Sequence, residues 1–332
     1  LSTTNNSNST PSIANSSQIK VKSFGLIGQS WAMLFASAGY QVGIYDVEIE
    51  QVKKALHNIE QQLLDLEEQG LLRGNLNKHE QRERITAAST IGDCVKGAFY
   101  IQECVPERLD IKKGVWGEVD KIVNGDVIMA SSSSSLLPSK ISDGLKHRNR
   151  FVVSHPTNPP FYAPLVEIIP APWTDDDVVP TTKSLLERIG QVPVVLKKEI
   201  DGFVLNRIQY SIIGEAWRLI NDDIISAEDL DKVMSTGLGV RYAFMGPLET
   251  AYLNADGMKS YIERYAEMIY RIQTSFGQPL PMGGQTGDKI HRELESYVCP
   301  VESLTERRQW RDKRLAALAK LKKEMDKGDS AS

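Results

Sequence analysis

The sequence lacks the features that mark disulfide-rich, metal-binding or membrane-spanning proteins. Only three cysteines occur in 332 residues, Cys94, Cys104 and Cys299, and they stand far apart with no metal-ligand spacing. The sequence therefore predicts neither a disulfide framework nor a metal site, and it favours a reducing, cytoplasmic compartment. No apolar run reaches the roughly 18 residues that a membrane-spanning helix requires, so no membrane partner is expected.

The charges of the chain do not gather into a surface for a polyanion. The net charge is −4, and Lys and Arg are interspersed among Asp and Glu. The pattern therefore predicts no nucleic-acid partner. Residues 1–18 are mostly Ser, Thr and Asn. Because such a stretch buries too little apolar surface to offset its ordering entropy, we expect a disordered polar tail.

Short apolar runs alternate with helical patterns between Ile19 and about residue 198. This alternation predicts an α/β fold with a Rossmann-type, mostly parallel, doubly wound sheet over residues 19–200. Because the later strands follow one another closely, part of the sheet is expected to be mixed. Only helical patterns follow, which predicts an all-helical C-terminal domain over residues 201–327. The expected strands cover residues 41–46, 99–104, 126–131, 150–155, 165–169 and 191–197.

Residues 23–28 read Ser-Phe-Gly-Leu-Ile-Gly and occupy the place of a dinucleotide-binding loop. Such a loop uses three glycines, for the tight turn, for the approach of the pyrophosphate and for packing of helix on strand. Gly25 and Gly28 supply the second and third, whereas Ser23 replaces the first. A helical pattern follows at once, so its amino terminus would face a phosphate. The next strand leads to Asp46, whose carboxylate would bind ribose hydroxyls and favour NAD over NADP.

The strand before this loop departs from the usual pattern. A central parallel strand is covered on both faces and normally reads as a continuous apolar run. Here Lys20 and Lys22 alternate with Ile19 and Val21, and burial of an unpaired ammonium is costly. Two interpretations stay open, a working cofactor loop that tolerates Ser23 and a loop with weakened affinity for NAD.

Three stretches bring polar residues to strand ends or to the first helix of the C-terminal part. They are "ASSSSSLLPSK", "VVSHPTNPPFYAPLVEIIP" and "DGFVLNRIQYSIIGEAW". Histidine readily exchanges a proton near neutral pH, so His155 is suited to take a hydroxyl proton as hydride leaves the same carbon. Glu167 would hold the other ring nitrogen and fix the tautomer. Taken singly, His155, Ser134 and Asn206 fit a structural role equally well.

Together these stretches resemble the 3-hydroxyacyl-CoA dehydrogenase family, through its His-Pro-x-Asn-Pro and Gly-Phe-x-x-Asn-Arg signatures. The match is closest to the lambda-crystallin branch, through "QSWAMLFAS", "IQECVPE", "GFVLNRIQY", "EAWRLI" and "RYAFMGPLET". The resemblance implies that His155 and Glu167 form a catalytic pair. It also implies that Ser134 and Asn206 lie beside the reacting oxygen of the substrate.

The resemblance implies further residues on the cofactor side and extends the substrate side. It implies backbone contacts to NAD from Leu26 and Ile27, and side-chain contacts from Glu107 and Lys112. For the substrate, Ser133 or Ser135 is a lesser candidate for the role of Ser134, because five serines run together. A guanidinium can form two parallel hydrogen bonds to a carboxylate. Because a sugar acid carries a carboxylate, Arg241 is predicted to bind that group of the substrate.

The resemblance also implies an activity and an assembly. The expected reaction is NAD-dependent oxidation of the 3-hydroxyl of a small sugar acid, L-gulonate to 3-dehydro-L-gulonate. The alternative substrates are a 3-hydroxyacyl-CoA or a simple 3-hydroxy acid. An alternative of another class is a non-catalytic, crystallin-like structural protein with an impaired cofactor loop. In this family the helical domain makes the dimer contact, so the resemblance implies a homodimer.

Overall fold

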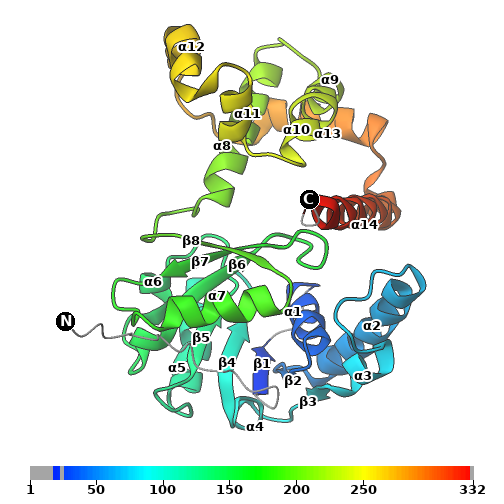
Figure 1. The fold of residues 1–332 in the computed structure, drawn as a ribbon, viewed down its shortest axis with the longest axis vertical. Helices are drawn as coiled ribbons and strands as arrows, with labels where there is room; N and C mark the ends of the chain where they lie inside the picture. The colour runs from blue at the N-terminus through cyan, green and yellow to red at the C-terminus, as the bar shows by residue number, and fades with distance from the viewer. Residues whose placement is uncertain (1–17, 23–25, 330–332) are drawn as a thin grey trace, which may run out of the picture. The chain divides into compact units, whose positions relative to one another are not determined.

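The structure is a computed structural model, and it describes residues 18–22 and 26–329. The chain divides into two compact units between Asn206 and Arg207 (Figure 1). The predictions for residues 1–17 of the polar tail, for Ser23 and for Gly25 lie outside the described residues. Gln18, which was predicted to end the tail, instead begins the first strand. So do the side chains of Lys20 and Lys22.

The first unit is built on one eight-stranded sheet (Figure 1). The strand order is β3-β2-β1-β4-β5-β6-β7-β8, and its first six strands follow the order of a dinucleotide-binding sheet. All neighbouring strands are parallel except β6 and β7, which are antiparallel. The predicted doubly wound sheet with a mixed part is therefore confirmed. The strands are β1 (Gln18–Lys22), β2 (Gln41–Tyr45), β3 (Ile85–Ala87), β4 (Ala98–Glu103), β5 (Ile128–Ser131), β6 (Phe151–Pro156), β7 (Leu165–Pro170) and β8 (Val192–Val195).

Two hydrophobic cores cover the two faces of this sheet. Successive side chains of a strand point to opposite faces, so Tyr100 packs in one core and Ile101 in the other. The first core includes residues of α1 (Leu26–Ser37), α2 (Ile49–Glu68) and α7 (Val178–Arg188). The second core includes residues of α4 (Ile91–Val95), α5 (Leu109–Asp120) and α6 (Pro138–Ser142). The short helix α3 (Lys78–Glu83) precedes β3.

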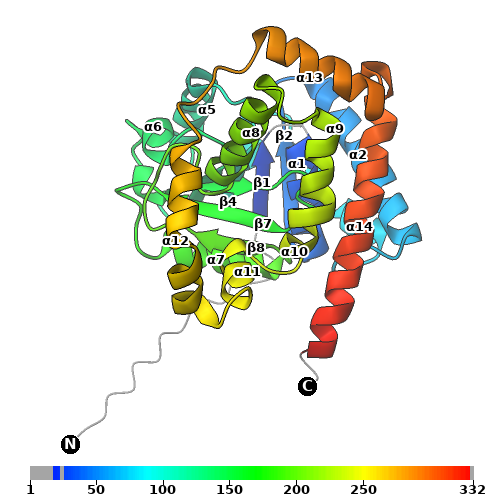
Figure 2. The same cartoon turned by 90° about the horizontal axis from the view of Figure 1, so that it is seen from above.

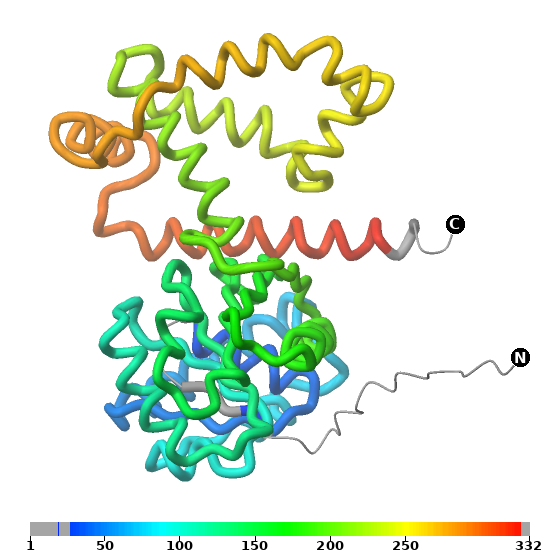
Figure 3. The backbone as a smooth tube through the Cα atoms, turned by 90° about the vertical axis from the view of Figure 1, so that its left-hand side faces the viewer, coloured from blue at the N-terminus to red at the C-terminus, as the bar shows by residue number. Residues whose placement is uncertain are grey.

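The described part of the second unit contains helices and connections but no strand, as Figure 3 shows. The last helix is a single long one (Figure 2). Ser226 caps α9, since its hydroxyl accepts the N–H of Asp229 at 3.1 Å. The helices are α8 (Leu205–Asn221), which begins in the first unit, α9 (Ala227–Lys232), a π-helical turn (Val233–Leu238), α10 (Gly239–Tyr242), α11 (Pro247–Leu253), α12 (Gly257–Thr274), α13 (Gly284–Tyr297) and α14 (Leu304–Asp329).

The π-helical turn was not predicted, and a glycine explains it. The wide turn closes where the N–H of Gly239 donates to the carbonyl of Met234. A Cβ atom at position 239 would lie only 2.7 Å from that carbonyl oxygen. Because glycine has no Cβ atom, the two backbone groups approach without a clash. The segment from Ala227 to Leu238 is therefore α9 followed by this turn.

Candidate active site

His155 and Glu167 face each other across the antiparallel strands β6 and β7. They are register partners in that pair, and directly opposed residues on one face of a sheet lie within contact distance. The Nδ1 atom of His155 lies 2.8 Å from Oε2 of Glu167. Their side chains expose only 7% and 1% of their surface. The structure therefore brings two of the predicted catalytic residues together in a nearly water-free place.

The second oxygen of Glu167 is held by the start of helix α8. Its Oε1 accepts the N–H of Val204 at 2.8 Å and that of Leu205 at 3.0 Å. Burial raises the pKa of Glu167, but hydrogen bonds from His155, Leu205 and Val204 outweigh it and lower the pKa below its ordinary value. Since a carboxylate only accepts hydrogen bonds, Nδ1 of His155 carries the hydrogen and Nε2 keeps a lone pair. Nε2 is thus the atom that can take a proton.

Phe203 packs beside the imidazole of His155, with the ring centroids 5.6 Å apart. Its side chain is fully buried, and its φ of +50° is a left-handed conformation that a bulky residue rarely adopts. Such backbone strain persists where the surrounding structure enforces it, often at functional sites. The turn at Phe203 therefore both supports the imidazole and aims the N–H groups of Val204 and Leu205 at Glu167. Sequence reasoning missed this residue, although it belongs to the Gly-Phe-x-x-Asn-Arg signature.

The serine loop, residues 131–136, wraps around the carboxylate of Glu107. Three successive backbone N–H groups, from Ser134 to Leu136, donate to its Oε1 at 2.9 to 3.3 Å. The hydroxyl of Ser133 adds a bond of 2.6 Å. Burial raises the pKa of Glu107, but Ser133, a nearby lysine and the backbone N–H groups lower it below its ordinary value. The shape of the loop that carries Ser134 thus depends on one charged group.

Asn206 joins the serine loop to helix α8. Its Nδ2 atom donates to the carbonyl oxygen of Ser134 at 2.7 Å, and the residue is 7% exposed. An amide nitrogen carries two hydrogens, so one donor remains beside Ser134. Asn206 and Ser134, the two residues predicted beside the reacting oxygen, are therefore in direct contact with each other.

The carboxyl ends of β1 and β4 mark the place for a dinucleotide. The strand order reverses there, and ligands of doubly wound sheets bind at such a switch point. The first turn of α1 contains no acidic residue, and within it Ile27 is half-buried and Gly28 buried. Asp46 follows β2, is partly exposed and accepts the N–H of Glu48 at 3.0 Å through Oδ1, which leaves acceptor sites for hydroxyls. These residues fit an adenine dinucleotide.

Glu107 and Lys112, predicted as cofactor contacts, are engaged with protein groups. The Nζ atom of Lys112 lies 3.4 Å from Glu107 and 2.9 Å from Glu103. The side chain of Lys112 is 1% exposed, whereas that of Glu107 is 33% exposed. A contact of either residue with NAD stays a prediction. Glu103 was missed by sequence reasoning, although it lies in the quoted stretch "IQECVPE" and ends a buried strand.

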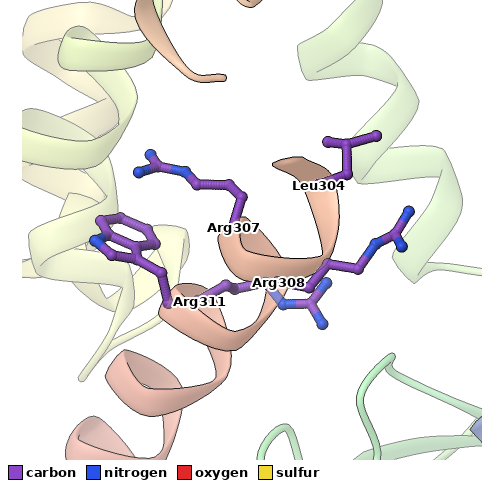
Figure 4. Close-up of a pocket in the computed structure, with 5 residues that line it drawn as sticks. Leu304, Arg307, Arg308 and Arg311 are labelled. Carbon is purple, nitrogen blue, oxygen red and sulfur yellow. The ribbon is translucent and has the colours of Figure 1, made fainter. Parts of the chain in front are cut away.

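Arg241 lies on α10 in the second unit, where its side chain is exposed. Its role in substrate binding stays a prediction. A shallow hollow at the start of α14 is lined by Leu304, three arginines and Trp310 (Figure 4). This hollow offers cationic and apolar groups but no carboxylate, histidine or nucleophile, so it supplies none of the chemistry of a dehydrogenase.

The described residues hold no arrangement suited to a metal ion, since no three His, Cys, Asp or Glu side chains converge there. Cys94, Cys104 and Cys299 form no disulfide. Over the same ranges, no helix has the length and apolar character needed to cross a membrane.

Comparison with known families agrees with this geometry. Residues 18–200 match the model described as 3-hydroxyacyl-CoA dehydrogenase, NAD binding domain, and residues 202–293 match the C-terminal domain of the same family. The chain belongs to the 3-hydroxyacyl-CoA dehydrogenase family. As a member of this family it binds NAD and is an NAD-dependent oxidoreductase.

The chain is similar to two relatives and to one solved structure over most of its length. Lambda-crystallin of Oryctolagus cuniculus is 50% identical, over 91% of this chain and 95% of its own. L-carnitine dehydrogenase of Oceanobacillus iheyensis is 34% identical, over 79% of this chain and 84% of its own. The structure of an NAD+-dependent 5-formyl-3-hydroxy-2-methylpyridine 4-carboxylic acid 5-dehydrogenase superposes with a TM-score of 0.72 at 26% identity, over 94% of this chain and 99% of that one.

Proposed function

We propose that the chain oxidises the 3-hydroxyl of a small sugar acid, L-gulonate, to the 3-keto acid with formation of NADH. The observation that carries the chemistry is the buried contact of 2.8 Å between His155 and Glu167. The sugar acid is supported by the 50% identity to a lambda-crystallin over nearly the whole chain and by the resemblance to that branch in the quoted motifs.

In the proposed reaction, Nε2 of His155 takes the proton of the substrate hydroxyl. NAD, when bound, supplies the acceptor for the hydride that leaves the same carbon. Glu167 stays ionised, keeps the imidazole in the reactive tautomer and stabilises the imidazolium that results. The burial of both side chains strengthens this interaction because little water screens it. The products are a ketone, NADH and a proton held on His155.

Ser134 and Asn206 bind the oxygen that becomes the ketone. The hydroxyl of Ser134 and the remaining N–H of Asn206 are both donors. Donors fixed in advance stabilise negative charge that develops on an oxygen without reorganising during the reaction. The bond of 2.7 Å from Asn206 to the backbone of Ser134 supports a common role for the two residues.

Arg241 is proposed to bind the carboxylate of the substrate. The support is chemical, since a guanidinium offers a planar pair of donors that matches a carboxylate, and since the Arg241 side chain is exposed on α10. In an Arg241→Met variant the KM for the sugar acid should rise at least about tenfold, the loss of one charge-assisted hydrogen bond. An unchanged KM would remove Arg241 from the site.

Substrate choice distinguishes this proposal from its alternatives. NADH formation should be compared with L-gulonate, 3-hydroxybutyrate, 3-hydroxybutyryl-CoA and L-carnitine, the last because one relative is named L-carnitine dehydrogenase. The highest kcat/KM with L-gulonate supports the proposal. The highest kcat/KM with another compound of the panel would show that L-gulonate is not the preferred substrate, while the proposed dehydrogenase reaction would stand. No turnover with any of them favours a crystallin-like structural protein. The joint presence of Ser134, His155, Glu167 and Asn206 argues against that outcome.

The protein is further proposed to act in the cytoplasm as a homodimer formed through its helical unit. Exposed large apolar side chains mark surfaces that bind other proteins, and several occur on α8 and α12 of the single chain. They are Ile208, Tyr210, Ile212, Ile262, Met268, Tyr270 and Ile272. Light scattering coupled to gel filtration should give twice the mass of 37.0 kDa. A single-chain mass at micromolar concentration would contradict the dimer.

A further inference from the structure

A buried cluster of charges lies behind the serine loop. Glu103 ends β4 and its side chain is 1% exposed. Its Oε2 accepts the hydroxyl of Ser131 at 2.6 Å and the indole N–H of Trp116 at 3.3 Å. Its Oε1 accepts the N–H of Val105 at 2.6 Å and a hydrogen of Lys112 at 2.9 Å. Every partner of this carboxylate is thus a donor, which a buried charge requires.

Lys112 connects this cluster to the serine loop. Its ammonium lies between two carboxylates, 2.9 Å from Glu103 and 3.4 Å from Glu107, and it also donates to the carbonyl of Val105 at 3.2 Å. A buried ammonium must be paired to stay charged. Its hydrogen bonds to Glu103 and to the carbonyl of Val105 fix the ammonium, and the ion pair of 3.4 Å places its charge beside Glu107.

Glu107 completes the connection, because its Oε1 accepts the backbone N–H groups from Ser134 to Leu136. The strand β4, which carries Glu103, also pairs with β5, and Glu103 and Ser131 are register partners there. The serine loop is therefore tied to Glu103 twice, directly at Ser131 and through Lys112 and Glu107 at Ser134. A shift of the buried carboxylate would move both ends of the segment from 131 to 134.

We propose that Glu103 and Lys112 are positioning residues that hold the hydroxyl of Ser134 in place through Glu107. This proposal rests on the proposed function of Ser134 at the reacting oxygen. It differs from a general structural role because it predicts that the effect of Glu103 on turnover passes through Ser134. Misplacement of a reacting group by about 1 Å costs up to about 100-fold in rate, which sets the size of the expected effect.

The test is a double-mutant cycle between Glu103→Gln and Ser134→Ala, measured as kcat for NADH formation on the substrate that turns over fastest. Glu103→Gln should lower kcat by about 10- to 100-fold. In the Ser134→Ala background it should lower kcat by less than about threefold, since coupled residues are not additive. Full additivity of the two losses would overturn the proposal and assign Glu103 a purely structural role.

Asp120→Asn is the matched control, because Asp120 lies on the same helix α5 as Lys112. Its carboxylate also accepts backbone N–H groups, those of Lys146 at 2.6 Å and His147 at 3.0 Å, outside the serine loop. Its effect on kcat should be less than about threefold and should add to that of Ser134→Ala. If Glu103→Gln does not melt cooperatively, Trp116→Phe removes one donor to the same carboxylate and should give a coupled loss of about threefold. An additive loss in that variant would also overturn the proposal.

Hydrogen exchange separates this proposal from the proposed function. Backbone N–H groups from Ser134 to Leu136 should exchange at least about tenfold faster in Glu103→Gln, because the carboxylate that accepts them loses its anchor. They should keep their wild-type rates in Asp120→Asn. If Ser134→Ala leaves kcat unchanged, the proposed role of Ser134 is wrong, and faster exchange in Glu103→Gln would still support the positioning of the loop. Unchanged exchange in Glu103→Gln would overturn the positioning itself.

Discussion

His155 and Glu167 lie directly opposite each other on adjacent antiparallel strands, with Nδ1 of the imidazole 2.8 Å from the carboxylate. Nothing in this contact depends on a loop between them, because the register of the two strands sets their separation. The opposite oxygen of Glu167 receives two N–H groups from the start of α8. The pair is therefore fixed at both ends before any substrate arrives.

Replacing Glu167 by glutamine should damage catalysis far more than cofactor binding. A glutamine amide cannot compensate an imidazolium, and it cannot accept the hydrogens of His155, Val204 and Leu205 with the same strength. We expect kcat to fall by about 10²- to 10⁴-fold, with the calorimetric dissociation constant of NAD unchanged. Asp120→Asn is the matched control, since Asp120 makes a similar 2.9 Å contact with His147. A comparable loss in both variants would contradict the catalytic role of Glu167.

Glu167 should also contribute to stability in a pH-dependent way. Its pKa in the folded chain is lowered, so the unfolded chain binds more protons in acid than the folded chain does. Its contribution is therefore fully present above the ordinary glutamate value of about 4.3 and is lost as the pH falls through the lower folded value. In urea melts between pH 3 and pH 7, the free energy of unfolding should change less with pH in Glu167→Gln than in wild type. Equal slopes would show that the charge of Glu167 does not stabilise the fold.

Asn206→Ala should lower turnover through the reacting oxygen and through Ser134. The variant removes the bond to the backbone of Ser134 and the neighbouring donor. Loss of one such donor typically costs about 10²- to 10³-fold in kcat. Asn149→Ala is a suitable control, because Asn149 also donates through its amide, to Asp175 at 2.6 Å on an exposed surface. If Asn206→Ala behaves like this control, the oxygen is bound by other groups.

Asp46→Ser should weaken the binding of NAD and reduce the preference of the protein for NAD over NADP. The carboxylate at the end of β2 accepts ribose hydroxyls and repels a 2′-phosphate. We expect the dissociation constant of NAD to rise about tenfold, the value of one charge-assisted hydrogen bond, and the ratio of NADP to NAD affinity to rise further. The exposed neighbour Glu50, paired with Lys53 at 2.7 Å, offers Glu50→Gln as a charge-matched control. Unchanged cofactor preference in Asp46→Ser would place the ribose elsewhere.

Much of the sheet could be predicted from the sequence because its central strands, β4 to β7, are buried on both faces. The runs over residues 99–104 and 150–155 became β4 and β6 with a shift of one residue, since two-sided burial leaves a continuous apolar pattern. Strand β3 was missed because its three residues, of which only Ile85 is buried, are too short to show a period. Pairing order also lies beyond local patterns, because it depends on contacts between distant segments.

The site residues that lie in a sequence motif could be predicted, whereas those whose role depends on a long-range contact could not. His155 and Asn206 stand in recognisable signatures. Glu103 and Phe203 also lie in such stretches, but their roles depend on their contacts. Glu103 contacts Lys112 and Trp116, and Phe203 contacts the imidazole of His155, and local periodicity does not predict these contacts. The bond between Asn206 and Ser134 joins residues 72 positions apart. Contacts of this kind form only when the strands of the sheet have paired and brought distant segments together.

The central claim, NAD-dependent oxidation with His155 as the base, is tested most directly by NADH formation from L-gulonate in wild type and in His155→Ala, with NAD binding measured by calorimetry in parallel. Wild type should turn over, and His155→Ala should lose about 10²- to 10⁴-fold in kcat while it binds NAD with the wild-type affinity. Turnover that survives in His155→Ala, with NAD binding unchanged, would contradict the account.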